Sequence, residues 1–125
     1  MTNGDKMASA WLLTCAGVIG AVGVAAAAGS SHLEESRNLA AIASICLAHG
    51  PALLALAILA GRGRLFLLAG GVMALGTLIF VGDLGLREWR GQGVFPGAAP
   101  LGGLGMIAGW LGVVLAAWVN RPAKN

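Results

Sequence analysis

The segment "SICLAHGPALLAL", residues 44–56, places His49 two residues before Pro51 in an otherwise apolar run. An imidazole at membrane depth can relay a proton, bind haem or a metal ion, or contact a substrate. The alternative is a neutral ring that bonds to a backbone carbonyl or to a Ser or Thr of the next helix. Pro51 has no N–H, so it predicts a bend and an unused carbonyl at Leu47.

A second pair of polar residues has helical spacing. Asp83 and Arg87 lie four residues apart, which predicts an ion pair on one helix face near the outer membrane surface. The functional alternative is an entry point for a cation or a proton. His32 is the other histidine, and it is expected at the outer end of the first span. Helix rise then separates it from His49 by about 15 Å along the membrane normal, so a bis-histidine haem is not expected.

The remaining reactive residue types form no recognisable set. Cys15 and Cys46 are the two cysteines, and their different depths predict two small buried side chains, not a disulfide. No Ser-His-Asp set, paired carboxylate, phosphate-binding loop or CxxC motif occurs. We therefore expect no catalytic residue, no metal and no cofactor, and we predict that the protein is not an enzyme.

The composition indicates the surroundings in which these residues lie. Of the 125 residues, 58% are hydrophobic and 10% are charged, and the mean hydropathy is +0.83. In a soluble domain roughly a quarter of the residues are charged. The chain is therefore predicted to lie in a membrane. The net charge of +3 is scattered along the chain, so nucleic acid is not an expected partner.

Four apolar runs are long enough to cross a bilayer, which takes roughly 20 residues per helix. Because lipid offers no partners for peptide groups, the spans must be α-helices. We predict an all-α fold, a single-domain membrane bundle (1–125) of four transmembrane helices with short loops. The spans are expected at 7–29, 39–60, 65–86 and 100–120, and the loops at 29–38, 61–64 and 83–100.

The first span has an alternative interpretation. Lys6, the apolar run after it and the small residues in "VAAAAGSS" are also typical of a secretory signal. The run is longer than the core of most signals, which favours a span.

The distribution of basic residues predicts the orientation of the spans. The side with both termini carries Lys6, Arg62, Arg64, Arg121 and Lys124 against Asp5, while the other side carries Arg37, Arg87 and Arg90 among Glu34, Glu35, Asp83 and Glu88. Since basic residues stay on the cytoplasmic face, both termini are predicted to be cytoplasmic. Trp11 and Trp118 are expected near that same interface.

Small residues recur every four positions on three spans. They are Gly17, Ala21, Ala25 and Gly29 on the first, Ala40, Ser44, Ala48 and Ala52 on the second, and Gly105 and Gly109 on the fourth. In lipid, such stripes allow close backbone contact between helices. We expect them to pack within the bundle, and a dimer face is the alternative. Short loops predict that sequential helices are antiparallel neighbours.

The last span, "APLGGLGMIAGWLGVVLAAW", contains the most specific motif. Pro100 can open the helix at its first turn, and Gly102, Gly103, Gly105 and Gly109 permit tight contact. With Trp110, the phrase resembles the Pro-x-Gly-Gly…Gly-Trp signature of the domain of unknown function 423 family. These are small four-span inner-membrane proteins whose eukaryotic relative is called transmembrane protein 256.

Two further phrases match that family more loosely, "GSSHL" with His32 and "AHGPALL" with His49. The chain departs from the family pattern in having no tyrosine, in Pro51, and in Asp83 where a small polar residue is expected. The resemblance implies a four-span bundle in a bacterial inner membrane and brings no established reaction.

Two functions of different class follow. The first is an accessory or structural subunit that packs against a larger inner-membrane assembly, such as a respiratory or other oxidoreductase complex. Its partners would be lipid and other membrane subunits, or a second copy of this chain. The second is a small transporter, channel or metabolite-binding protein with His49 and Asp83 on its path.

Overall fold

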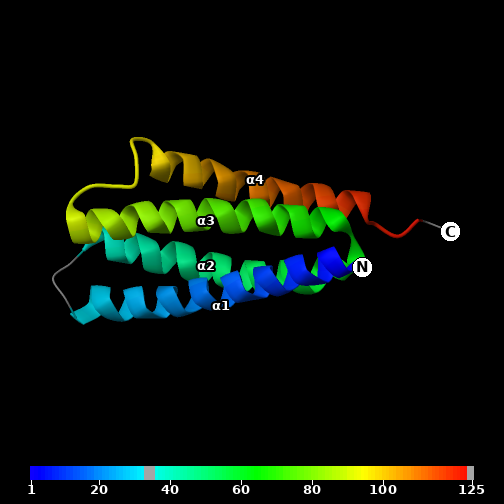
Figure 1. The fold of residues 1–125 in the computed structure, drawn as a ribbon, viewed down its shortest axis with the longest axis horizontal. Helices are drawn as coiled ribbons and strands as arrows, with labels where there is room; N and C mark the ends of the chain where they lie inside the picture. Colours follow the sequence, from blue (N-terminus) through cyan, green and yellow to red (C-terminus); the bar gives the residue numbers. More distant parts are fainter. Residues whose placement is uncertain (33–35, 124–125) are drawn as a thin grey trace.

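The computed structural model describes residues 1–32 and 36–123, which form four long α-helices and no strand. The helices are α1 (Asn3–His32), α2 (Arg37–Leu59), α3 (Arg64–Arg90) and α4 (Ala98–Val119), with a short 3-10 helix, η1 (Ala60–Arg62), before α3. The chain runs back and forth, so that sequential helices are antiparallel (Figure 1). The predicted all-α fold is confirmed.

The two ends of the bundle differ in what they hold. One end, here called the termini end, holds both chain termini and η1, while the loop end holds the connections after α1 and α3 (Figure 1). Lys124, Glu34 and Glu35, which also entered the predicted orientation, lie outside the described part of the chain.

All four helices are long and apolar enough to cross a membrane. Large apolar side chains cover the outside, such as Trp11, Ile58 and Leu111, which are 66%, 72% and 64% exposed. A water-facing surface of this kind would be very costly, whereas lipid tails solvate it well. The chain is therefore a multi-pass membrane protein.

Two helices are longer than the predicted spans. The predicted third span ends at 86, whereas α3 continues to Arg90. It ends where Gly91 adopts a left-handed conformation (φ 72°) and its N–H donates to the Arg87 carbonyl. Likewise α1 continues to His32, since the hydroxyls of Ser30 and Ser31 donate to the Ala27 carbonyl and so do not interrupt the helix. The polar composition of these segments suggested loops, but their side chains form hydrogen bonds within the helix and so do not end it.

Capping side chains mark two helix starts. Ser36 caps α2, and its hydroxyl oxygen accepts from the Leu39 N–H at 3.2 Å. Near the start of α1, the Asp5 N–H donates to the Thr2 hydroxyl, and the Thr2 N–H donates to the Asp5 carboxylate. This is the reciprocal arrangement of a capping box.

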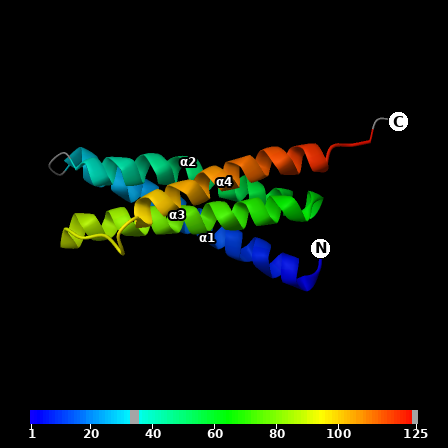
Figure 2. The same ribbon diagram turned by 90° about the horizontal axis from the view of Figure 1, so that it is seen from above.

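The helices pack mainly as sequence neighbours: α1 on α2, α2 on α3 and α3 on α4. In Figure 1, α1 and α4 lie on opposite sides of the α2–α3 pair. Figure 2, seen from above, shows α4 crossing over α3 and α1 diverging from the other helices toward the N-terminus. Near the termini end, residues of α1 and α3 line an open hollow.

Backbone-to-backbone contact through glycine holds α3 and α4 together. A Cβ added to Gly76 would lie 2.6 Å from the Met106 backbone nitrogen, and one added to Gly102 would lie 2.6 Å from that of Phe80. Gly105 and Gly109 approach Gly76 and Met73 in the same way. The predicted small-residue contact on the fourth span is thus present. Gly103 is an exception, because a Cβ there would meet nothing within 4 Å.

Most of the small-residue stripe predicted on the first span does not pack within the bundle, the exception being Gly29, where a Cβ would lie 3.6 Å from Leu39 of α2. Gly17 and Ala21 are exposed, and a Cβ on Gly17 would meet nothing within 4 Å. The helix uses another face instead, where Gly20 lies against Gly50 and Gly23 lies against Cys46 of α2. This face packs against α2 in preference to the Gly17–Ala21 stripe because it also buries larger side chains such as Ile19. The within-bundle prediction for Gly17 and Ala21 is wrong.

The stripe on the second span also faces outward. Ala40, Ser44 and Ala48 are exposed, and Ala52 is half-buried. The α1-facing and α3-facing sides of α2 are instead formed by its buried residues, such as Cys46 and Leu53. Spacing of four alone therefore did not identify the packed face.

Candidate functional site

His49 lies in the middle of α2 and is 6% exposed. Its Nδ1 lies 2.8 Å from the carbonyl oxygen of Ile45, one turn earlier on the same helix. A carbonyl oxygen only accepts hydrogen bonds, so Nδ1 carries the proton and Nε2 holds a lone pair. This tautomer is neutral, as a ring at membrane depth requires without a counter-charge.

The lone pair of His49 Nε2 accepts a hydrogen bond from the indole N–H of Trp110 on α4, at 3.1 Å. The two rings meet edge to face, with centroids 5.9 Å apart and planes at 70°. Each ring thus satisfies the polar group of the other, in a region where water is not available. The interpretation of His49 as a neutral ring expected a bond to a backbone carbonyl or to a Ser or Thr of the next helix. The structure has the carbonyl bond, to Ile45, and the side-chain partner is the indole of Trp110 on α4.

His49 and Trp110 occupy equivalent positions along their helices, and this could have been seen in the sequence. His49 lies twelve residues beyond the start of α2, and Trp110 lies twelve residues beyond the start of α4. Both helices begin at the loop end, so at 1.5 Å per residue both side chains lie about 18 Å along their helices. Trp110 was predicted only as a packing residue. Matching depths on parallel spans would have suggested a bond between them.

Asp83 forms the second polar site, at the loop end of α3. The side chain is fully buried, and one carboxylate oxygen accepts from Arg87 Nε at 2.8 Å. The other oxygen accepts from the backbone N–H of Val94 at 2.8 Å. A Cβ on Gly93 would contact the Asp83 carboxylate, so glycine is needed for this close approach. The predicted Asp83–Arg87 pair thus also fastens the connection between α3 and α4.

Glu88 links the loop end of α3 to the start of α2. Its Oε2 accepts from the Ser36 hydroxyl at 2.8 Å and from Asn38 Nδ2 at 3.2 Å. The sequence did not reveal this contact, because the residues are fifty or more positions apart and only the antiparallel arrangement brings them together.

His32 is not part of either site. It is the exposed last residue of α1, while His49 is buried at mid-helix on α2. The structure therefore does not bring the two histidines together as a ligand pair. Within residues 1–32 and 36–123, no group of three His, Cys, Asp or Glu side chains is placed to hold a metal ion. Cys15 and Cys46 are free thiols.

The polar groups buried inside the described helices are all bonded. No buried side-chain nitrogen or oxygen of the described residues lacks a hydrogen-bond partner. Sites that bind or transfer ligands usually present polar groups toward a cavity. His49 and Asp83 instead direct theirs at Trp110, Arg87 and the Val94 backbone.

These features define a small multi-pass membrane protein in which internal polar bonds and glycine contacts hold four helices. The chain belongs to the family described as "Protein of unknown function (DUF423)", whose match covers residues 16–103. The match contains His32, His49 and Asp83 and the Pro100–Gly103 start of the carboxy-terminal phrase, and it ends before Trp110. No curated protein and no solved structure matches the chain.

Proposed function

We propose that this protein is a non-catalytic accessory or structural subunit that packs against a larger complex in a bacterial inner membrane, such as a respiratory or oxidoreductase complex. The observation that carries the proposal is the outward position of two small-residue stripes. Gly17 and Ala21 on α1 and Ala40, Ser44 and Ala48 on α2 leave shallow surface where another helix can approach closely.

The bonding of the interior polar groups supports a packing role over a transport role. A transported ion or metabolite needs groups that can exchange partners with it. His49 Nε2 already accepts from Trp110, and the Asp83 carboxylate already accepts from Arg87 and Val94. These bonds therefore count against His49 and Asp83 as groups on a transport path.

The orientation in this proposal has both termini in the cytoplasm. The termini end carries Lys6, Arg62, Arg64 and Arg121, and the loop end carries Arg37, Arg87 and Arg90. The excess of basic residues at the termini end favours the cytoplasmic side under the positive-inside rule.

The test is purification of the native protein in a mild detergent. We expect a partner in fixed stoichiometry, and we expect Ala21→Leu to lower its recovery severalfold, since the added side chain fills the α1 stripe. Ala108→Leu is the matched control, because Ala108 is exposed on α4, away from that stripe. It should leave recovery unchanged.

Two results would contradict the subunit proposal. One is recovery of a lone monomer under gentle conditions. The other is recovery of a dimer of this chain alone, which would assign the stripes to self-association. Equal recovery of partner by Ala21→Leu and Ala108→Leu would exclude the α1 stripe as the contact surface.

A further inference from the structure

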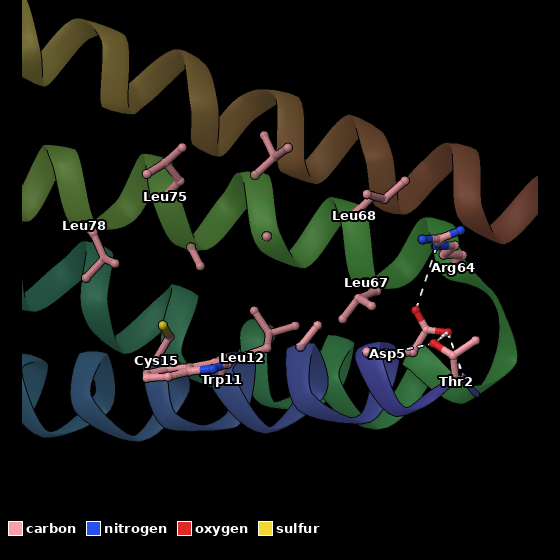
Figure 3. A pocket seen from close by; sticks show the side chains of 15 residues that line it. Thr2, Asp5, Trp11, Leu12, Cys15, Arg64, Leu67, Leu68, Leu75 and Leu78 are labelled. Atoms are coloured by element: carbon pink, nitrogen blue, oxygen red, sulfur yellow. Dashed lines mark hydrogen bonds and ion pairs between the residues drawn. The ribbon is translucent and has the colours of Figure 1, made fainter.

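A long groove opens between α1 and α3 at the termini end, here called the α1–α3 groove. It arises because α1 diverges from the other helices toward the N-terminus (Figure 2). Its volume is about 750 Å³, and its walls include Trp11, Leu12 and Cys15 from α1 and Leu67, Leu75 and Leu78 from α3. Figure 3 shows Leu12 and Cys15 of α1 and Leu67 of α3 directed into the space between the two helices, while the ring of Trp11 lies along α1. The volume lies within the roughly 300–1,000 Å³ of small-molecule sites.

The polar lining of the groove is confined to one end. Thr2, Asp5 and Arg64 lie there, and the walls beyond are apolar (Figure 3). The Arg64 side chain is 82% exposed, and its Nε lies 3.8 Å from Asp5 Oδ1. That distance is longer than a charge-assisted hydrogen bond of about 2.8 Å, so the guanidinium keeps most of its bonding capacity. Arg62 lines an adjoining hollow and adds positive charge at this end.

The length of the groove corresponds to one leaflet of a bilayer. From Arg64 to Leu78 along α3 is fourteen residues, or about 21 Å of helix. Half of a hydrocarbon core is about 15 Å, and a head group lies beyond it. A second hollow of about 720 Å³ lies at the loop end, where residues of α1, α2 and α3 line it, and it shares no lining residue with the first. A straight partner helix would need one continuous groove across the membrane. Two separate hollows, each about as long as one leaflet, suit lipid chains better.

We propose that the α1–α3 groove binds one anionic phospholipid of the leaflet at the termini end. The phosphate bonds to the guanidinium of Arg64, whose planar set of donors suits phosphate oxygens. An acyl chain lies between α1 and α3, against Leu12 and Leu75. This site is separate from the stripes of the proposed subunit contact, so either proposal can fail without the other.

The test measures lipid retention by native mass spectrometry of the delipidated full-length protein. Phosphatidylglycerol and phosphatidylcholine with the same acyl chains are added back in turn. We expect one phosphatidylglycerol to bind more tightly than phosphatidylcholine, and Arg64→Gln to reduce that preference about fivefold, which is the effect of one basic contact with an anionic lipid. Arg121→Gln, at the same end but outside the groove, should retain the preference.

A second pair of variants tests the acyl-chain part of the site. A Cβ on Gly71 would meet nothing within 4 Å, and Gly71 lines the groove. Gly71→Phe should therefore fill the groove without disturbing the bundle and reduce the retention of both lipids. Gly103→Phe is the matched control, since Gly103 is equally open but lies on α4. Equal retention by these two variants would overturn the proposal, as would equal preference in Arg64→Gln and Arg121→Gln.

Photo-crosslinking of the unaltered protein covers the case in which a variant fails to fold. A phosphatidylglycerol with a diazirine in its acyl chain is irradiated with the protein in bilayers, and the modified peptides are mapped. Crosslinks concentrated in residues 8–15 and 67–78 are expected. Crosslinks spread evenly over all four helices, or found mainly on an associated protein that fills the groove, would contradict a specific lipid site.

Discussion

The stripes of small residues on α4 and on α1 share their spacing and differ in their position. An added Cβ on Gly102 or Gly109 of α4 would overlap atoms of α3, and one on Gly105 would lie 3.0 Å from the Gly76 Cα. A Cβ on Gly17 of α1 would meet nothing within 4 Å. The two stripes differ in the helix surface that faces them. On α3, Gly76 leaves room for the α4 backbone. A small-residue stripe thus allows another helix to pack closely, but close packing occurs only where the neighbouring helix has a complementary surface.

The largest expected effect comes from adding a side chain at the close contact between α3 and α4. Gly76→Ala should lower the free energy of unfolding by about 3 kcal/mol, because its Cβ would meet α4 backbone atoms that cannot move independently. Unfolding in mixed SDS and detergent micelles, followed by circular dichroism, measures the change.

Gly103→Ala is the control for that experiment. It adds the same methyl group to the same helix pair in open space, and it should be neutral or slightly stabilising because alanine favours helix. Equal destabilisation by both variants would contradict the difference between the two glycine environments.

A smaller effect is expected from the bond that joins α4 to α2. Trp110→Phe keeps the ring but removes the N–H donor, leaving His49 Nε2 without its partner. We expect a loss of about 1 kcal/mol in the same unfolding assay.

A double-mutant cycle separates this bond from general packing. His49→Leu and Trp110→Phe together should cost less than the sum of the single changes, with a coupling of about 1 kcal/mol. Strictly additive effects would show that the two rings do not depend on one another.

The smallest effect is expected from the open stripe. Gly17→Ala should change the free energy of unfolding of the isolated protein by less than about 0.5 kcal/mol, because the position is exposed and has room. A loss comparable to that of Gly76→Ala would place the α1 stripe inside a contact between copies that persists in detergent.

Some of the candidate site could be predicted from the sequence. The Asp83–Arg87 pair is a local feature of one helix, so its spacing of four residues was enough. The partner of His49 could not be read in this way, because Trp110 lies sixty-one residues away. The role of Glu88 in holding the start of α2 was missed for the same reason.

The sequence by itself determined the membrane surroundings, the all-α fold and the four spans. Lipid imposes these features on any chain with this length and distribution of apolar residues, because peptide groups in hydrocarbon must bond within each helix. Only the tertiary structure decided which face of each helix is packed, that His49 meets Trp110, and that α1 diverges to open a groove. Those outcomes depend on how two surfaces fit, and the free energy of such contacts belongs to pairs of helices, not to any one segment.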